Sequence, residues 1–323
     1  MDIEKNDLAA KAALLYYEQN CNQNEVAEQL NISRSYVSQL LSYAKDIGVV
    51  NISVRLDAFS LRSLKQEIFF QKRWPGLKRV YIMDSQSSAF SSSNLGKFAA
   101  PFVADSISFS SCIGINPGVS VERTVSQLIY QTIAQSSDKQ VVQMMGGFQM
   151  GTSQDSAQPN EIAKQLGSVL GCDVHYLNCP AFIQQKRLYS QLIRERSIAS
   201  VIEMWEDIDL AIMGLGVADE RSKLCQMFDT AQMNLVRESG ACGMLNTTFF
   251  DGEGNLLDLF ENQKIGIHLD ALHKAQKLVI CSDQYKAAAL RAALKGNFID
   301  ILITDLITVE AVNALDDTIK ENG

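Results

Sequence analysis

The stretch "NQNEVAEQLNISRSYVSQLL" (residues 22–41) predicts two short amphipathic helices joined by a tight turn. Asn22 can cap the first helix by accepting a hydrogen bond from a backbone N–H, and Glu25 can reach back to the backbone N–H of Asn22. This reciprocal pair is a capping box. It predicts a helix over about residues 23–30.

A second helix is predicted over residues 33–46, after a turn in which Asn31 tolerates a left-handed conformation and Ser33 supplies the cap. Apolar residues at steps of three and four predict a buried stripe of Val37, Leu40, Leu41, Ala44 and Ile47. The opposite face shows hydroxyls, an amide and cations. Such a face suits a DNA major groove, because small residues allow close approach and Arg and Gln can bind base edges. The alternative is the solvated face of a plain helical bundle.

The flanking segments complete a predicted DNA-binding domain over residues 1–56. Residues 8–20 have the spacing of a supporting first helix, and residues 49–56 alternate as a short strand, a candidate wing. Nine residues are predicted to contact DNA: Gln23, Ser33, Arg34, Ser35, Tyr36, Ser38, Gln39, Ser42 and Lys45. The domain holds five basic and seven acidic residues, so its positive surface must be local. Affinity must then come partly from joining several such modules in an oligomer.

Composition indicates a soluble globular protein of two or three domains, with 323 residues and a net charge of −8. No apolar run reaches the roughly 18 residues that span a bilayer, and the chain starts with an acidic, polar segment. We therefore expect a cytoplasmic protein. The seven cysteines are scattered without a CxxC pair, which argues against disulfides and zinc.

From about residue 78, short apolar runs alternate with helix-length segments. Seven runs predict buried strands: "RVYIMD" (79–84), "SCIGI" (111–115), "QVVQMM" (140–145), "DVHYL" (173–177), "DLAIMG" (209–214), "KLVIC" (277–281) and "DILIT" (300–304). The alternation predicts an α/β domain over residues 78–323, with a doubly wound, mostly parallel, Rossmann-like sheet.

Between the two predicted domains, residues 57–77 contain one amphipathic segment. "FSLRSLKQEIFFQKRW" (59–74) places Leu61, Leu64 and Ile68 at helical steps. One heptad is compatible with either of two roles, a short self-association seam or a linker helix packed on the next domain.

Ligands of parallel sheets bind beyond the carboxyl ends of the strands, which directs attention to four loops. These are "NPGVSVERTV" (116–125), "GLGVAD" (214–219), "ESGACGMLNTTFFDGEGN" (238–255) and "CSDQYKAAALRAALKGN" (281–297). The first opens a predicted helix whose backbone donors and dipole favour an anion, and Lys286 falls in the first turn of another helix. For each loop the alternative is simple turn geometry.

Catalysis has no visible candidate set. His175, His268 and His273 lack metal-type spacing, and no nucleophile elbow, Walker loop or clustered acid pair appears. We therefore expect no enzyme activity, no metal and no cofactor. An enzyme that isomerises or hydrolyses sugar phosphates is the alternative, with Glu122, Asp219 or Asp283 as its general base. A third alternative is a scaffold that only oligomerises. It does not explain why the predicted helix over residues 33–46 has a face suited to a DNA groove.

The sequence resembles the SorC/DeoR-type family of bacterial transcriptional regulators over nearly its whole length. Residues 22–50 resemble the family's helix-turn-helix pattern, with Gln39 where Arg is common. "VVQMMGG" (141–147), "GLG" (214–216), "GACGMLNTTFFDGEGN" (240–255) and "KAAALRAALKGNFIDILITD" (286–305) match the family's effector domain in order and spacing. The resemblance implies a fold related to sugar-phosphate isomerases, operator binding by an oligomer, typically a tetramer, and control by a sugar or sugar phosphate.

The resemblance, together with the strand-end loops, implies an effector site made of Gly118, Ser120, Glu122, Arg123, Thr124, Gly146, Gly147, Gly214, Gly216, Asp219, Gly240, Asp283 and Lys286. This chain departs from the family at several of these loops. "GVSWGRTV" becomes "GVSVERTV", "GAVGD" becomes "GACGM", and "GGxxK" becomes "SDQYK". Met145 stands where some relatives carry a lysine. Glu122 and Asp283 add carboxylates near the expected phosphate, so a sugar, polyol or sugar acid without phosphate is the second expectation.

Overall fold

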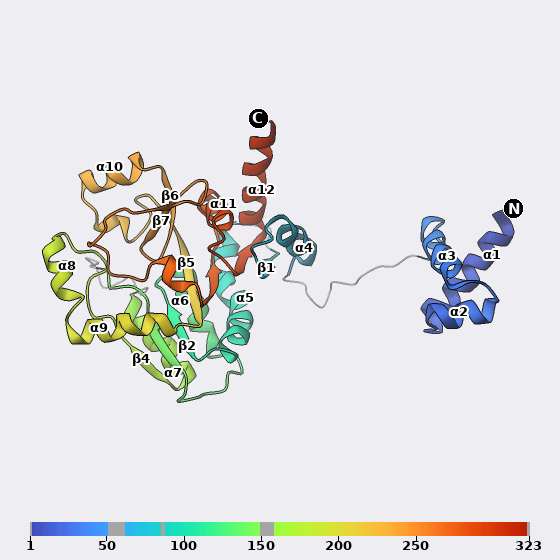
Figure 1. Ribbon diagram of the computed structural model, residues 1–323, viewed down its shortest axis with the longest axis horizontal. Helices are drawn as coiled ribbons and strands as arrows, with labels where there is room; N and C mark the ends of the chain where they lie inside the picture. The colour runs from blue at the N-terminus through green and yellow to red at the C-terminus, as the bar shows by residue number, and fades with distance from the viewer. Residues whose placement is uncertain (1, 51–61, 85–87, 149–157, 322–323) are drawn as a thin grey trace. The chain divides into compact units, whose positions relative to one another are not determined.

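The computed structural model describes residues 2–50, 62–84, 88–148 and 158–321, and the chain separates into two compact units, Met1–Ala58 and Phe59–Gly323 (Figure 1). Each unit has its own apolar core. Residues 51–56 of the expected wing and Leu61 of the expected linker stripe lie outside the described residues.

The N-terminal unit contains α1 (Asp2–Ala13), a π-helical turn (Leu14–Glu18), α2 (Gln23–Leu30) and α3 (Arg34–Asp46). The predicted first helix at 8–20 is therefore confirmed over residues 8–18, although α1 begins six residues earlier and is continued by a π-helical turn. The three helices enclose a small core whose fully buried members include Ala9, Val26 and Leu40.

Both predicted helix caps are confirmed. The Asn22 Oδ1 accepts hydrogen bonds from the N–H groups of Asn24 (3.0 Å) and Glu25 (3.2 Å), while the Asn22 N–H donates to Glu25 Oε2 at 2.7 Å. Asn31 has a φ of 51°, and the Ser33 Oγ accepts from the Tyr36 N–H at 3.2 Å. Local hydrogen bonds thus fix the turn between α2 and α3.

The predicted stripe of α3 is confirmed for Val37, Leu40, Leu41 and Ala44, all of which are buried. Ile47 is an error, because α3 ends at Asp46 and the Ile47 side chain is 38% exposed.

The C-terminal unit begins with α4 (Leu64–Arg73), which packs on strand β1 (Arg79–Met83). This contact is the one expected of a linker helix packed on the next domain. Its inward face differs from the predicted stripe, since Glu67 and Phe70 are buried whereas Ile68 is 73% exposed. The Glu67 carboxylate accepts two bonds from Arg62 Nε and Nη2 (both 2.7 Å) and one from the Ile82 N–H (2.9 Å), which explains how an acid lies inside.

All seven predicted strands are present and form one parallel sheet in the order β1-β10-β9-β5-β2-β3-β4. Besides β1 they are β2 (Cys112–Ile115), β3 (Gln140–Gln143), β4 (Asp173–His175), β5 (Leu210–Val217), β9 (Gln276–Ile280) and β10 (Ile301–Asp305). An antiparallel ribbon of β6 (Ala241–Leu245), β7 (Thr248–Asp251) and β8 (Leu256–Leu257) extends from β5.

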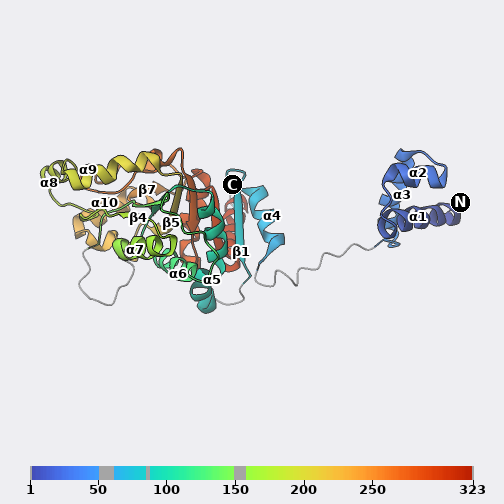
Figure 2. The ribbon, with the colours of Figure 1, turned by 90° about the horizontal axis from the view of Figure 1, so that it is seen from below.

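Helices cover both faces of the sheet, as predicted for a doubly wound domain (Figure 2). One face carries α5 (Ser88–Ser108), α6 (Val119–Leu128) and α7 (Pro159–Leu170), and the other carries α4, α9 (Arg196–Glu203), α11 (Ala287–Lys295) and α12 (Leu306–Glu321). Successive side chains of β5 point to opposite faces of the sheet. Ile212 packs in the core beneath α5, α6 and α7, whereas Ala211 and Met213 pack in the core on the other face. The remaining helices are α8 (Lys186–Leu192) and α10 (Thr230–Glu238).

The chain reverses its direction of travel across the sheet between β2 and β5. From β2 it proceeds to β3 and β4 on one side, and from β5 it proceeds to β9 and β10 on the other. At such a switch point the connections that leave two neighbouring strands run to opposite sides, and this leaves a crevice beyond the carboxyl ends of the strands. The fold therefore places a ligand crevice above β2 and β5.

Close packing of α5 on α6 leads to a stability prediction. A Cβ added to Gly96 would lie 2.6 Å from the carbonyl oxygen of Arg123, against backbone that has little room to move. Alanine normally stabilises a helix interior by about 1 kcal/mol relative to glycine. We expect Gly96→Ala instead to lower the free energy of unfolding by about 1–2 kcal/mol through overpacking.

Urea unfolding of the full chain measures this change, with Gly252→Ala as the control because nothing lies within 4 Å of a Cβ built there. A Gly96→Ala protein as stable as the parent would show that α5 and α6 can separate without cost.

Candidate functional site

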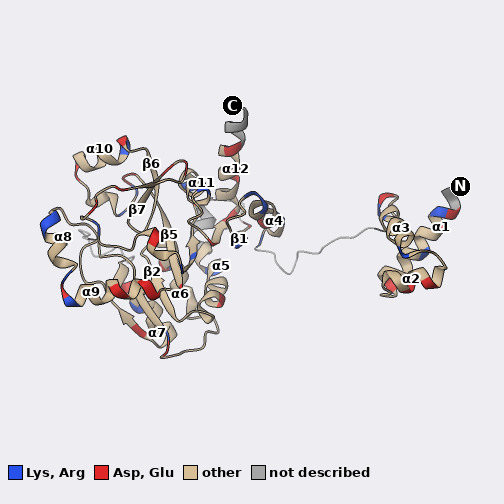
Figure 3. Cartoon of the chain, in the orientation of Figure 1, with Lys and Arg blue, Asp and Glu red and all other residues tan. Residues whose placement is uncertain are grey.

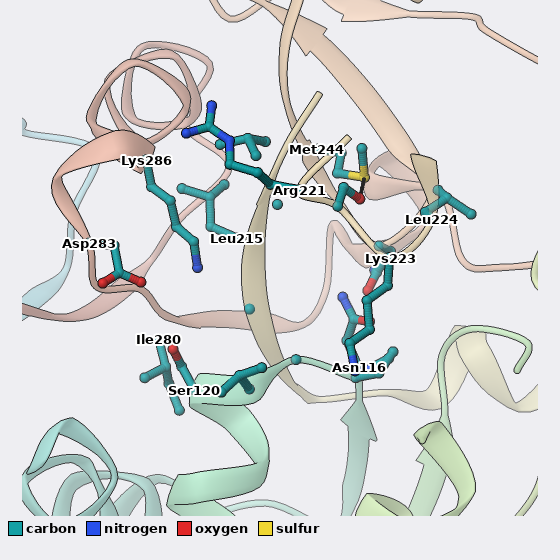
Figure 4. Close-up of a pocket in the computed structure, with 18 of the residues that line it drawn as sticks. Asn116, Ser120, Leu215, Arg221, Lys223, Leu224, Met244, Ile280, Asp283 and Lys286 are labelled. Atoms are coloured by element: carbon teal, nitrogen blue, oxygen red, sulfur yellow. Dashed lines mark hydrogen bonds between the residues drawn. The ribbon is translucent and has the colours of Figure 1, made fainter. Parts of the chain in front are cut away.

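A cavity of about 310 Å³ lies at the switch point of the sheet (Figure 4). Its walls come from the residues that follow β2 and β9, from the far half of β5, from the β6–β7 ribbon and from the start of α6. Segments that are more than a hundred residues apart in the sequence thus meet at one edge of the sheet. The volume suits a small metabolite.

Three buried polar side chains in the cavity wall have side-chain atoms without a hydrogen-bond partner. They are Asn116 (4% exposed), Asn246 (3%) and Ser282 (1%). Unpartnered atoms are the Oδ1 of Asn116, the Oγ of Ser282 and both amide atoms of Asn246. Burying such groups costs free energy unless a partner arrives. These atoms are therefore suited to hydrogen-bond a polar ligand.

Backbone structure determines where these three side chains lie. The Asn116 N–H donates to the Ile212 carbonyl at 3.0 Å, which continues the β2–β5 pairing by one residue. Asn246 occupies the two-residue turn between β6 and β7 with a φ of 52°, a conformation that Asn tolerates. Ser282 lies two residues after the end of β9, next to the fully buried Cys281.

Positive charge surrounds these neutral groups. Arg123, Arg221, Lys223 and Lys286 line the cavity, against one lining carboxylate, Asp283. Arg221 is oriented by an ion pair with Asp219, and its guanidinium lies 4.5 Å from the centre of the Tyr285 ring. The side-chain hydrogen bonds from Arg221 hold the pKa of Asp219 below its usual range. The excess of cations favours an anionic ligand.

The start of α6 adds to this preference. Gly118 is its N-cap residue and forms no side-chain cap, and Gly118, Val119 and Ser120 all line the cavity. The first backbone N–H groups of a helix have no partner within the helix and carry the positive end of its dipole. An anion in the cavity can therefore meet backbone donors as well as side chains.

The structure brings seven of the thirteen predicted effector residues into the cavity wall: Gly118, Ser120, Arg123, Gly214, Gly216, Asp283 and Lys286. Gly214 and Gly216 lie within β5, which runs to Val217, so the expected loop at 214–219 is wrong for its first four residues. The segment 238–255, predicted as a loop that enters a strand and then a glycine-rich turn, does contain strand structure, because β6 and β7 form a hairpin there.

Six predicted residues lie outside the cavity wall. Glu122 borders a separate surface hollow beside α7 with Glu161 and Lys164, and Asp219 pairs with Arg221. The fully buried Thr124 hydroxyl donates to the Ser120 carbonyl at 2.7 Å. The other three are Gly146, which packs on the backbone of Pro180, Gly147, whose N–H donates to the Cys179 carbonyl, and Gly240, which turns the chain before β6 with a φ of 74°.

Sequence reasoning missed seven polar cavity residues: Asn116, Arg221, Ser222, Lys223, Asn246, Ser282 and Tyr285. A signal existed for Asn116 and Ser282, because each directly follows a correctly predicted strand. Arg221 and Lys223 lie in an irregular segment after β5, where no pattern distinguishes them from surface cations.

In the N-terminal unit, eight residues border a shallow hollow along α3: Gln23, Arg34, Ser35, Ser38, Gln39, Ser42, Tyr43 and Asp46. Six of these belong to the predicted DNA-contacting set. Of the other predicted residues, Ser33 caps α3, Tyr36 packs against the core, and the exposed Lys45 has its Nζ 6.0 Å from the centre of the Tyr17 ring. Basic and acidic residues both occur among the three helices (Figure 3).

Among the described residues no group of three His, Cys, Asp or Glu side chains could hold a metal ion. None of the described helices combines the length and apolarity that a membrane span requires.

A helix-turn-helix unit followed by an α/β unit with a metabolite-sized cavity defines the class of the protein, a ligand-responsive DNA-binding regulator.

Comparisons with known proteins agree with this class. Residues 60–313 match the family model described as "Putative sugar-binding domain", and residues 14–46 match "Sigma-70, region 4". The chain belongs to the SorC/DeoR-type family of transcriptional regulators, whose members join a helix-turn-helix to this sugar-binding domain.

Full-length relatives include the deoxyribonucleoside regulator of Bacillus subtilis (strain 168), 26% identical over 97% of this chain and 99% of the relative. The sorbitol operon regulator of Klebsiella pneumoniae is 24% identical over 94% and 96%, respectively. The crystal structure of the full-length sorbitol operon regulator SorC from Klebsiella pneumoniae has the same fold, with a TM-score of 0.72 at 22% identity over 96% of this chain and 99% of that one.

Proposed function

We propose that the protein binds operator DNA of a carbohydrate-utilisation operon in the cytoplasm, and that a sugar, polyol or sugar phosphate in the cavity controls its DNA affinity. The observation that carries this proposal is the pairing of three unpartnered buried polar groups with an excess of cations at the switch point. Hydroxyl groups would satisfy Asn116, Asn246 and Ser282, and the excess of cations would attract a phosphate. A phosphorylated ligand is the first expectation.

DNA is proposed to meet the exposed face of α3, through Arg34, Ser35, Ser38, Gln39 and Ser42, with Gln23 at the start of α2. These residues border one continuous hollow, which supports a single docking surface. Ser33 and Tyr36 contribute by fixing α3. This surface is small, so a single copy would bind DNA weakly. Its size supports action as a homo-oligomer, with a tetramer expected from the family, because several linked copies bind with a higher overall affinity.

Control requires that the ligand favour one arrangement of the protein over another, since equal affinity for both would leave DNA binding unchanged. The proposal includes no catalytic step. Among the described residues that line the cavity, Asp283 carries the only carboxylate, so no acid and base side chains converge there.

Thermal stability against a panel of free and phosphorylated sugars, polyols and sugar acids tests the effector. A ligand that binds only the folded state stabilises it by about 2.7 kcal/mol at a hundredfold excess over its dissociation constant. We expect a phosphorylated compound to raise the melting temperature, and Lys286→Ala to remove most of that rise.

Lys295→Ala is the matched control, because Lys295 lies at the end of α11, the helix that begins directly after Lys286, and pairs with Glu253 outside the cavity. An equal rise in the Lys286→Ala protein would contradict the phosphate assignment. A rise from unphosphorylated compounds alone would leave a polyol or sugar acid as the effector.

A further inference from the structure

The cavity has a buried floor and an exposed mouth. Its three unpartnered polar residues form the floor, and each of them is at most 4% exposed. Three other lining residues reach solvent and mark the mouth: Val119 (47% exposed), Arg221 (54%) and Tyr285 (45%). Figure 4 shows Arg221 across the cavity from Asn116 of the floor. A compound that reaches the floor therefore passes these three side chains.

Two of the mouth residues contact each other. The Arg221 guanidinium lies 4.5 Å from the centre of the Tyr285 ring, within the range of a cation–π interaction. Arg221 belongs to the segment 218–224 that follows β5, and Tyr285 belongs to a short 3-10 turn (Gln284–Lys286) that follows β9. The contact thus connects two separate strand-end segments at the mouth of the cavity.

The arginine of this pair is held from its own segment. Its Nε donates to both carboxylate oxygens of Asp219, at 3.1 and 3.0 Å, and its backbone N–H donates to Asp219 Oδ1 at 2.9 Å. The neighbouring Glu220 forms an ion pair with Arg237 on α10, which fastens the segment to the surrounding structure. The guanidinium is therefore placed before it meets the ring.

The contact between the two segments is weak by comparison. A cation–π interaction between half-exposed side chains contributes little free energy, and exposed side chains change rotamer rapidly. Arg221 and Tyr285 can therefore separate and meet again without disturbing the backbone of either segment. A reversible contact across the mouth of a buried cavity can control passage through it.

We propose that the Arg221–Tyr285 contact is a gate, closed in the free protein, which opens when a small molecule enters or leaves the cavity. The gate sets the rate of exchange rather than the choice of ligand, so it goes beyond the proposed function and does not depend on which compound binds. Asp219 is a positioning residue of this gate, because it orients Arg221.

Access to the cavity floor can be measured without an effector. The variant Asn116→Cys places a thiol at the floor, and N-ethylmaleimide, a small neutral reagent, labels that thiol only after it has passed the mouth. Peptide mass spectrometry identifies the labelled residue, because the chain has seven cysteines of its own. Ser120→Cys on the cavity wall is a second reporter, which repeats the comparison if Asn116→Cys folds poorly.

Three changes test the gate in the full-length reporter protein. Arg221→Ala and Tyr285→Ala each remove one partner, whereas Tyr285→Phe keeps the ring. Arg79→Ala is the matched control, since Arg79 is 53% exposed and pairs with Asp105 outside the cavity wall. All four side chains are exposed enough that the melting temperature should stay that of the reporter protein.

We expect each alanine variant to be labelled about three- to fivefold faster than the reporter protein, which is the change that the loss of one exposed cation–π interaction produces. The double alanine variant should be no faster than the single variants, because each of them already breaks the same contact. Tyr285→Phe and Arg79→Ala should leave the rate unchanged.

An unchanged labelling rate in both alanine variants would overturn the gate. Rates that multiply in the double variant would overturn it too, because the two side chains would then narrow the mouth independently. Equal rates in Tyr285→Phe and Tyr285→Ala would show that the ring does not close the mouth. None of these results depends on the effector, so failure of the sugar panel to raise the melting temperature would contradict the proposed function and leave the gate intact.

Discussion

Replacing Arg34 with alanine should lower operator affinity by about 10- to 100-fold for each DNA-binding unit, which is the loss expected for one bidentate contact with a base. Arg34 is exposed at the first position of α3, and it borders the hollow along this helix. It also borders a second hollow, lined otherwise by residues between 16 and 24. Losses at separate units add as free energies, so an operator held by two copies should lose about 2–6 kcal/mol. Fluorescence anisotropy with labelled operator at fixed salt measures the change.

Two further variants show what Arg34 contacts. Arg34→Lys keeps the charge but lacks the planar fork, so it should recover little affinity if Arg34 binds a base edge and most of it if Arg34 meets a phosphate. Lys11→Ala is the control, because Lys11 lies on α1 in an ion pair with Asp7 at 2.7 Å. A phosphate contact would also lower the slope of affinity against salt by about one unit.

Folding should be unaffected in the Arg34→Ala protein, because the core of this unit lies on the opposite face of α3. An unchanged melting temperature with unchanged operator affinity would refute the DNA surface proposed for α3.

Sequence reasoning succeeded where a structure depends on neighbouring residues. The capping box at Asn22 and the cap at Ser33 need only three or four residues, and both were predicted. The seven parallel strands were also predicted, because most are short apolar runs buried on both faces, while the edge strand β4 is only partly buried. The order of the strands was not, since it depends on contacts between distant segments.

The cavity shows where such reasoning stops. Asn246 reaches it only because the β6–β7 ribbon folds back over β5, which no pattern in the sequence indicates. Glu122 is an error of the opposite sort, a residue that was predicted to line the cavity and does not. It was included because it follows Val121 in the strand-end segment 116–125. On α6 the Val121 side chain turns into the core and Glu122 borders a different surface. A helical step of 100° per residue thus separates neighbours that a sequence motif treats together.

Replacing Asp316 with asparagine should lower the free energy of unfolding of the C-terminal unit by about 3 kcal/mol, the usual cost of breaking a buried ion pair by removing one partner. The Asp316 carboxylate on α12 is 11% exposed and binds two cations, Arg73 on α4 (2.9 Å from Nε) and Arg291 on α11. Burial alone would raise the pKa of this carboxyl, but the two arginines outweigh it and hold the pKa below its usual range.

The sign of the pKa shift fixes the pH dependence. Because the folded pKa is depressed, the stability from Asp316 is fully present above the unfolded pKa of about 3.9 and is lost as pH falls through the lower folded value. The difference between parent and Asp316→Asn should therefore be constant from pH 5 to pH 8 and shrink below about pH 4. Denaturant unfolding across this range measures it, with the exposed pair Arg79–Asp105 as the control, where Asp105→Asn should cost less than about 0.5 kcal/mol.

The position of Asp316 also links this stability to function. Helix α11 begins directly after Lys286 of the cavity, and α4 is the first helix after the point where the chain enters this unit. One carboxylate thus joins the two helices. We expect Asp316→Asn to bind the effector within about threefold of the parent protein but to change operator affinity less when it does, because a looser α4 transmits less of the coupling free energy. The ratio of operator affinities with and without effector measures this coupling, and an unchanged ratio in a destabilised protein would show that the three-helix contact serves stability alone.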